Sequence, residues 1–483
     1  MNYFIKSVYK PNLNPNYYYD LPQGIEYQYQ VYLLAQYLAN RGNKKYIIDL
    51  GSGNGEKLKK YFMNFKIITV DFGINSSFVN KDFEHINFNF EDGLPNLPVN
   101  ILSNAVVIVA DVIEHLIEPQ KFINNLSMWA RVSPYILIST PDRNRVRGLG
   151  DYGPPQNTAH VREWSLQEFY ELLAQNGIKN FLIGYTENND ILRQKVTILA
   201  ICGYEISFSS QEKKKILAIV NCYNEKDIII ETINHLLSQD IDVCVVDNNS
   251  NDGTFEIINH FFINNNRVCI RQSENYGNTY EWYKLLCNTE KISHEFSLKY
   301  DWFMHNDADE IRNAPISNIT LNDMISFVDN LGYNALDFTV LDFRFTKNND
   351  SVESNFEKNL LSFEFGRNPG HFQQVKAWKY SPNINLCESG GHDAKFPNRK
   401  IYPINFLTKH YPLRSYSQAI KKIYQDRITR IAKEQKERGW HAHYDKYIKG
   451  QANLNFNEYQ LIRWHQNIFD TEFLVERISR IGI

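Results

Sequence analysis

The stretch YIIDLGSGNGEKLKK, residues 46–60, decides the fold of the first half of the chain. It begins with a short β-rich apolar run, passes through three glycines in five residues and ends in a segment of helical character. Glycine lets the backbone approach a ligand where a side chain would collide, and the following helix offers unpaired N–H groups. The stretch therefore predicts a strand, a tight turn and a helix that border a cofactor crevice. A turn of this kind also serves NAD enzymes, so it does not name the cofactor.

Similar β-rich runs recur through both halves of the chain, separated by segments with helical spacing. The predicted strands are residues 46–50, 67–71, 105–110, 135–139 and 196–202, then 216–220, 243–246, 267–270, 301–304 and 336–340. This alternation is typical of a mainly parallel sheet covered by helices. Polar residues 207–215 separate the two patterns. We predict domains at residues 1–208 and 209–415, with a helical C-terminal extension at 416–483.

The length and composition of the chain limit the classes of protein that remain. Its 483 residues exceed what one core usually serves, and its net charge of −3 argues against a nucleic-acid partner. The six cysteines lack paired metal spacing and indicate reduced thiols in a cytosolic protein. Residues 105–110, the strongest apolar run, are too few to span a membrane. We expect a cytoplasmic protein without transmembrane segment or secretion, and leave open a peripheral contact with the inner face of the membrane.

Polar side chains follow the predicted strands of the first half. Asp71 ends the second strand, where a carboxylate can accept hydrogen bonds from both ribose hydroxyls. The motif ADVIEHL, residues 110–116, follows the third strand, and STPDR, residues 139–143, follows the fourth. In order and spacing these motifs resemble the class I S-adenosylmethionine-dependent methyltransferase family, in the branch that methylates small-molecule hydroxyl or carboxyl groups. The resemblance covers about residues 24–203.

The resemblance implies a binding site for S-adenosylmethionine. The residues that it assigns are Asp49, Gly51, Gly53 and Gly55 at the methionine part, Asp71 at the ribose, Asp111 at the pocket edge and Asn89 at the adenine. Asn89 stands where the family usually has an acidic residue, and its amide can still donate and accept hydrogen bonds.

Methyl transfer to a hydroxyl depends on positioning and is helped by a base. His115 is the predicted base, and His160, Glu114, Arg162 and Glu163 are further candidates. A purely structural histidine is the alternative for His115. A salt-bridged lid ahead of a helix at residues 167–175 is the alternative for Arg162 and Glu163.

Four turns of the second half also follow predicted strands. They are LAIVNCYNE (217–225), VVDNNSNDGT (245–254), RQSENYGN (271–278) and DWFMHNDADE (301–310). The triplet Asp307-Ala308-Asp309 is weak evidence alone, because such triplets occur by chance in acidic loops. After a buried strand and three matching turns, it resembles the GT-A fold of family 2 glycosyltransferases over about residues 215–414.

This second resemblance implies a nucleotide-sugar donor and a divalent metal, Mn²⁺ or Mg²⁺. A leaving nucleoside diphosphate gathers negative charge, which a cation on hard carboxylate oxygens neutralises. The assigned metal ligands are Asp307, Asp309 and His410, and the assigned donor contacts are Asn221, Tyr223, Asp247, Asp307, Lys409 and Arg414. Asn248 replaces an acidic residue that the family often has, which leaves the base of the nucleotide open.

An inverting transfer also needs a base for the acceptor hydroxyl. We predict His392, Asp393 and Glu388, with Asp337 and Asp342 behind them, while a simple turn cap is the alternative for the His392-Asp393 pair.

The sequence therefore predicts an α/β chain of two tandem Rossmann-like domains, a class I methyltransferase fold and then a GT-A fold, with the helical extension. The predicted function is a bifunctional enzyme of surface polysaccharide synthesis, acting on a glycan or lipid-linked saccharide acceptor. Fusion has a physical reason, since linkage raises the effective concentration of one product at the other site. The alternatives are a non-catalytic docking domain in the first half and a nucleotidyltransferase in the second.

Overall fold

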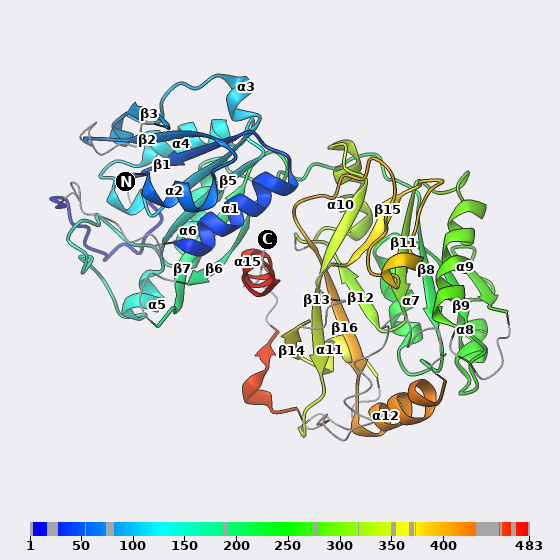
Figure 1. Cartoon of the computed structure of the whole chain (residues 1–483). Coiled ribbons are helices and arrows are strands. Elements are labelled where there is room, and N and C mark those ends of the chain that lie inside the picture. Colours follow the sequence, from blue (N-terminus) through cyan, green and yellow to red (C-terminus); the bar gives the residue numbers. More distant parts are fainter. Residues whose placement is uncertain are drawn as a thin grey trace. The chain divides into compact units, whose positions relative to one another are not determined.

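The computed structural model describes two compact units, which are treated separately (Figure 1). One unit comprises Met1–Ser209 with Gln466–Ile483, and the other comprises Ser210–His465. The described residues are 3–16, 28–53, 55–73, 82–187, 192–274, 279, 281–316, 318–348, 354–366, 371, 373–430, 454, 456–464 and 470–481.

A seven-stranded sheet forms the centre of the first unit. Its order is β3-β2-β1-β4-β5-β7-β6, parallel from β3 to β5, with β7 antiparallel to both its neighbours. The strands are β1 (Tyr46–Leu50), β2 (Lys66–Asp71), β3 (Glu84–Asn87), β4 (Ala105–Ala110), β5 (Tyr135–Pro141), β6 (Leu182–Glu187) and β7 (Lys195–Cys202). The chain order reverses between β1 and β4, and ligands of doubly wound sheets bind at the carboxyl ends of strands at such a point.

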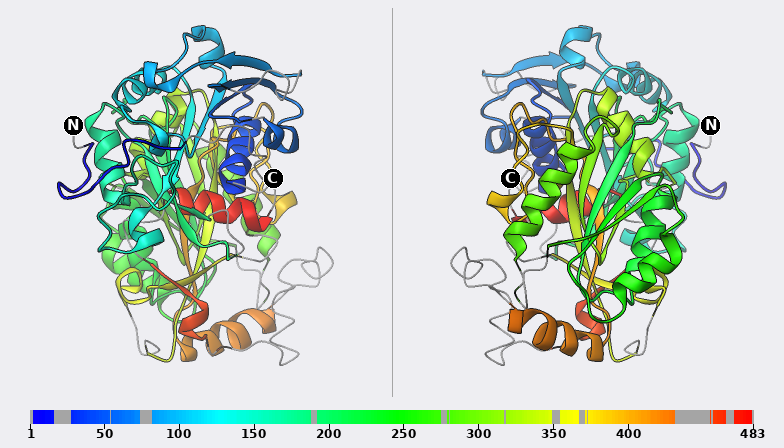
Figure 2. Two further views of the ribbon diagram at one scale, coloured as in Figure 1. Left: turned by 90° about the vertical axis from the view of Figure 1, so that its left-hand side faces the viewer. Right: turned by 90° about the vertical axis from the view of Figure 1, so that its right-hand side faces the viewer.

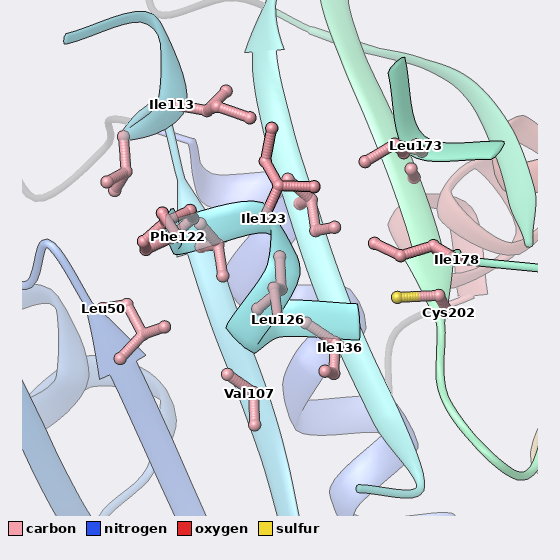
Figure 3. Close-up of a cluster of buried hydrophobic side chains, with 14 of the residues drawn as sticks. Leu50, Val107, Ile113, Phe122, Ile123, Leu126, Ile136, Leu173, Ile178 and Cys202 are labelled. Carbon is pink, nitrogen blue, oxygen red and sulfur yellow. The ribbon is translucent and has the colours of Figure 1, made fainter. Parts of the chain in front are cut away.

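Helices cover the sheet of the first unit. Its helices are α1 (Tyr29–Arg41), α2 (Glu56–Tyr61), α3 (Val99–Leu102), α4 (Gln120–Trp129), α5 (Arg143–Arg147), α6 (Leu166–Gln175) and α15 (Asp470–Ile481), with 3-10 turns η1 (Phe90–Asp92) and η2 (Ile113–His115). Figure 3 shows Phe122, Ile123 and Leu126 of α4 among side chains of the strands, such as Val107 and Ile136. Alternate strand residues thus build one core with α4, because successive side chains of a strand point to opposite faces.

The second unit is built on a larger mixed sheet. Its main path is β10-β9-β8-β11-β15-β13-β14-β17, parallel from β10 to β11, and β12 and β16 pair beside it. The strands are β8 (Ile216–Cys222), β9 (Asp242–Asp247), β10 (Val268–Gln272), β11 (Trp302–Asp307), β12 (Glu310–Asn313), β13 (Ala335–Arg344), β14 (Ser362–Phe365), β15 (Val375–Lys379), β16 (Phe406–Leu413) and β17 (Ile462–Arg463).

The helices of the second unit lie mainly beside its parallel strands, as the green ribbons of Figure 2 show. They are α7 (Ile229–Ser238), α8 (Thr254–Phe262), α9 (Trp282–Glu295), α10 (Leu321–Asn330), α11 (Phe356–Asn359) and α12 (Tyr416–Ile420), with 3-10 turns η4 (Cys387–Ser389) and η8 (Glu458–Gln460). After α12 the chain continues as a π-helix, η5 (Lys421–Arg427), and a 3-10 turn, η6 (Ile428–Arg430).

The prediction of two tandem α/β domains is confirmed, while the C-terminal residues differ from the predicted extension. Residues 416–430 are helical but belong to the second unit, and Ile462–Arg463 forms a strand that pairs with β14. Helix α15 belongs to the first unit, where it packs against α1, β6 and β7. An amphipathic pattern shows that one face of a helix is buried, but it does not show which partner buries it.

The composition led us to expect reduced cysteines and no membrane-spanning segment. All six cysteines are free thiols. Among the residues with a described structure, no helix combines the length and the apolar character that crossing a membrane requires.

Candidate functional site

The carboxylate of Asp49 lies at the carboxyl end of β1 and is 1% exposed. Its Oδ2 accepts a hydrogen bond of 2.9 Å from the Tyr32 hydroxyl. Its Oδ1 is buried without a hydrogen-bond partner among the described residues. Burial raises the pKa of Asp49 to about 7, although Lys57 and the Tyr32 hydroxyl act in the opposite direction. A cationic group beside Oδ1, such as the ammonium of the predicted cofactor, fits this unpaired oxygen.

The glycine turn joins Asp49 to the predicted ribose carboxylate. Oδ2 of Asp71 accepts from the N–H of Gly53 at 2.7 Å, and Oδ1 accepts from that of Phe72 at 2.7 Å. Burial raises the pKa of Asp71, while these two N–H groups lower it. A Cβ on Gly51 would lie 2.4 Å from Cγ2 of Val112, whereas one on Gly53 would meet nothing within 4 Å. Gly51 is thus required for packing, and Gly53 faces open space.

The remaining predicted cofactor residues lie in different settings. Asp111 follows β4, and its two oxygens accept from Ser139 Oγ and Gln28 Nε2, both at 2.7 Å. Gly55 precedes α2 with a φ of 73°. Asn89 caps η1, because its Oδ1 accepts from the N–H of Glu91 at 3.0 Å. The structure therefore gives Asn89 a local structural contact, and its contact with adenine stays a prediction.

His115 lies in η2 rather than on the face of an α-helix. Its Nδ1 donates to the carbonyl of Ala159 at 2.8 Å, and its ring lies 4.9 Å from that of His160, centroid to centroid. Burial, assisted by His160, lowers the pKa of His115 to about 4. A group with this pKa is a weak base at neutral pH. Arg162 donates to the carbonyls of Leu116 and Ile117, which supports the structural alternative for Arg162.

The second unit brings Asp309 and His410 together. Asp309 lies between β11 and β12, and pairing of β12 with β16 sets His410 opposite Glu310. His410 Nε2 is 3.7 Å from Asp309 Oδ1, and His410 Nδ1 donates to Asp342 Oδ1 at 2.7 Å. Asp342 thus directs Nε2 of His410 toward Asp309, as carboxylates commonly do for metal-binding histidines.

The charges around Asp309 keep it ionised. Burial would raise its pKa, but Lys422, whose Nζ lies 2.7 Å from Asp309 Oδ2, and His410 outweigh burial and hold the pKa well below its usual range. Burial would likewise lower the pKa of His410, yet the two carboxylates raise it. A carboxylate oxygen and an imidazole nitrogen that face each other fit a divalent cation. Asp307, the third predicted ligand, pairs through its Oδ2 with Lys376 at 2.8 Å, and its contact with a metal stays a prediction.

Three of the six predicted donor contacts, Asn221, Tyr223 and Asp247, lie at the carboxyl ends of β8 and β9. Asn221 Nδ2 donates to Thr289 Oγ1 at 3.0 Å, and its Oδ1 is buried without a hydrogen-bond partner in the described part of the chain. Asp247 Oδ2 accepts from the N–H of Ser250 at 3.0 Å. The Tyr223 ring lies 3.5 Å below the guanidinium carbon of Arg430. The unpaired oxygen of Asn221 is therefore a candidate contact for a nucleotide donor.

The two predicted phosphate-binding cations are compensated within the chain. Lys409 forms an ion pair with Glu357. Arg414, 1% exposed, pairs with Glu225 at 2.6 Å and with Asp227 at 2.7 Å. Both residues thus have partners within the chain, and their contact with phosphate stays a prediction.

Sequence reasoning missed the lysines that contact the acidic triplet. Lys422 Nζ lies 2.7 Å from both Asp309 Oδ2 and Glu225 Oε1, and Lys376 pairs with Asp307 and Glu310. Lys422 falls in the segment predicted as a separate extension, and Lys376 lies in a short strand that was not predicted, so no spacing pattern marks either one. The contacts of Lys376 and Lys422 with the acidic residues could therefore be found only from the structure.

The three predicted bases differ in their surroundings. Burial, together with the charge of Lys376, lowers the pKa of His392 to about 3. The Glu388 side chain is 63% exposed and pairs with Lys395 at 3.3 Å. Asp393 is largely buried and pairs with Arg399. Of the two carboxylates, Asp393 is the one that is buried.

A comparison with protein families finds that the model described as glycosyl transferase family 2 matches residues 217–281. These residues include β9, β10 and all but the first residue of β8, together with Asn221, Tyr223 and Asp247. The second unit contains a family 2 glycosyltransferase domain. The search of curated proteins gives no match.

Three solved structures that are similar to this chain are methyltransferases. The plantazolicin methyltransferase BamL, in complex with a triazolic desmethylPZN analog and SAH, has 15% identity and a TM-score of 0.28, and the match covers 37% of this chain and 85% of that one. The methyltransferase domain of bacterial CtHen1 has 19% identity and a TM-score of 0.24, covering 34% and 93%. A SAM-dependent methyltransferase from Aquifex aeolicus has 20% identity and a TM-score of 0.25, covering 37% and 94%.

Proposed function

We propose that the chain is a bifunctional enzyme that transfers a sugar from a nucleotide-sugar donor and a methyl group from S-adenosylmethionine. The observation that carries the first activity is the 3.7 Å approach of His410 Nε2 to Asp309 Oδ1, in the unit whose residues 217–281 match the glycosyltransferase model. The observation that supports the second activity is in the first unit, where Asp49 Oδ1 near the end of β1 is buried without a hydrogen-bond partner among the described residues. The acceptor is a glycan or lipid-linked saccharide.

In glycosyl transfer, Asp309 and His410 would hold a Mn²⁺ or Mg²⁺ ion, whose positive charge would offset the charge of the leaving diphosphate. Lys422 keeps Asp309 ionised and therefore ready to bind the cation. Asp342 fixes the ring of His410. The bond between the anomeric carbon and the diphosphate oxygen breaks as the acceptor oxygen bonds to that carbon, and Asp393 accepts the hydroxyl proton.

In methyl transfer, Asp49 binds the ammonium of the cofactor and Asp71 binds its ribose hydroxyls. The bond between sulfur and the methyl carbon breaks while the acceptor oxygen bonds to that carbon, and the hydroxyl proton is released. His115 would be a weak base for this proton at neutral pH, because its pKa is about 4.

Hydrolysis of a nucleotide-sugar panel by the full chain, with Mn²⁺ or Mg²⁺, tests the glycosyltransferase. We expect metal-dependent turnover of one donor, which Asp309→Ala abolishes. Asp323→Ala, a change of an acidic residue on α10, is the control and should retain turnover. Failure of folded protein to bind any donor would refute this half of the proposal.

Calorimetry with S-adenosylmethionine tests the methyltransferase independently. Saturable binding that Asp49→Ala weakens supports the proposed site, whereas folded protein without binding would leave the first unit as a docking domain. If the glycan product never accepts a methyl group, the two activities do not share one product.

A further inference from the structure

Three ligand-type side chains meet in the first unit from two separate segments. Glu114 and His115 lie in η2 after β4, and His160 lies in the segment before α6. The N–H of Val161 donates to the carbonyl of Glu114 at 2.7 Å, which ties the two segments together. One carboxylate oxygen and one nitrogen of each ring all lie within 4.8 Å of one another. Ligand atoms bonded to one ion at about 2.1 Å lie up to about 4 Å apart, so small shifts bring these three into range.

The hydrogen bonds of the two imidazoles determine which nitrogen can bind a ligand. His115 Nδ1 lies 2.8 Å from the Ala159 carbonyl, and His160 Nδ1 lies 2.7 Å from Glu163 Oε1. A carbonyl oxygen and a carboxylate oxygen accept hydrogen bonds, so both Nδ1 atoms donate their proton and the lone pairs belong to Nε2. Metal-binding histidines almost always donate their other ring N–H to a carbonyl or carboxylate in this way.

Glu114 supplies an unpaired oxygen to the same cluster. The side chain is fully buried, and its Oε2 accepts from Thr140 Oγ1 at 3.1 Å. Its Oε1 is buried and lacks a hydrogen-bond partner within the described ranges. Removing such an oxygen from water without a partner is costly, and a bound cation offsets that cost.

We propose that Glu114, His115 and His160 bind one divalent first-row transition metal ion, through Oε1 and the two Nε2 atoms. Two imidazoles with one carboxylate suit borderline ions such as Zn²⁺, Co²⁺ or Fe²⁺ better than Mg²⁺. Asn157 Nδ2 lies 2.9 Å from His160 Nε2, so the ion replaces the amide as the partner of that nitrogen. This site is separate from Asp309 and His410, which belong to the other unit.

Three protein ligands leave a coordination position for an exchangeable oxygen ligand. The following step rests on the proposed methyl transfer: an acceptor hydroxyl bound to the ion loses its proton more readily than a free one. The bound ion would thus promote loss of the hydroxyl proton, for which His115 alone is a weak base.

Co²⁺ titration of the full chain, followed by visible absorption, tests the binding site. The His410→Asn variant serves as the background, because it removes the imidazole of the glycosyltransferase site. We expect one Co²⁺ per chain in this background and at least a roughly tenfold loss of affinity on adding Glu114→Gln or His160→Asn. The matched control is His85→Asn, a change of a half-buried histidine on β3, which should leave the affinity unchanged.

Two further measurements keep the proposal testable if a substitution unfolds the protein. Glu163→Gln leaves all three ligands in place and should weaken Co²⁺ binding about 10- to 100-fold through the orientation of His160. X-ray absorption of Zn²⁺ bound to the His410→Asn protein needs no further change and should show imidazole and oxygen ligands. Sulfur ligands, an absence of Co²⁺ binding, or an unchanged affinity in folded His160→Asn protein would overturn the site. Co²⁺ binding without S-adenosylmethionine binding would instead overturn the proposed methyl transfer and leave the site intact.

Discussion

Replacing Asp49 by Asn should remove a large dependence of stability on pH from the first unit. Burial raises the pKa of Asp49 from 3.8 to about 7, so the folded state binds a proton that the unfolded state has already released between these values. The stabilising contribution is complete below about pH 4 and is lost as the pH rises toward 7. About three pKa units at about 1.4 kcal/mol each give a loss of about 4 kcal/mol over this range.

Pulse proteolysis in urea measures this effect, with mass spectrometry assigning the resistant fragments to residues 1–209. The quantity to compare is the difference in unfolding free energy between the wild type and Asp49→Asn. Other titrating groups, such as Glu114, are present in both proteins, so their contributions to the pH dependence cancel in this difference. We expect that difference to change by about 4 kcal/mol between pH 4 and pH 7, with the wild type losing stability as the pH rises. A difference that stays constant across this range would refute the assignment of the raised pKa to Asp49.

Three other outcomes follow from particular contacts. Binding of S-adenosylmethionine near pH 6 should release a proton from Asp49, which calorimetry in buffers of different ionisation enthalpy detects and Asp49→Asn abolishes. Lys376→Met should destabilise the second unit by about 3–5 kcal/mol in urea unfolding, because the buried carboxylate of Glu310 and the partly exposed one of Asp307 lose their cation. Lys379→Met on the same strand should cost under about 1 kcal/mol. Gly53→Ala should abolish cofactor binding while the protein stays folded, as calorimetry would show. Gly51→Ala should lower the urea concentration at which the first unit unfolds, because its Cβ would collide with a neighbouring side chain.

The first half of the chain could be predicted in detail where long apolar runs meet polar turns. All five strands expected there are present as β1, β2, β4, β5 and β7, and Asp49, Asp71 and Asp111 follow or end three of them. The strands that escaped prediction are β3, with the sequence EHIN, and β6, with LIGYTE. A four-residue strand and a strand interrupted by glycine and polar residues carry too little alternation to be distinguished from a loop. Their position depends on pairing with β2 and β7, which is a non-local contact.

In the second half, prediction succeeded along the parallel strands and weakened beyond them. β8 to β11 and β13 were expected, and β12, β14, β15, β16 and β17 were not. The His410 assignment rested on the family resemblance, yet Asp342, which orients its ring, comes from β13 and has no marked spacing to it. Buried ion pairs such as Asp309 with Lys422 join residues 113 positions apart. Contacts of this kind depend on tertiary packing, which composition and periodicity do not report.

The return of the chain to the first unit limits how the two proposed activities can be separated. Helix α15 follows the whole second unit in sequence and packs on α1, β6 and β7. Its buried apolar residues are Phe473, Leu474, Val475 and Ile478. Four such side chains contribute about 6–12 kcal/mol when buried, which equals much of the 5–15 kcal/mol that typically stabilises a domain. A fragment that ends at residue 208 would lack this contribution, so the first unit is best assayed within the full chain, with single substitutions to silence the other site.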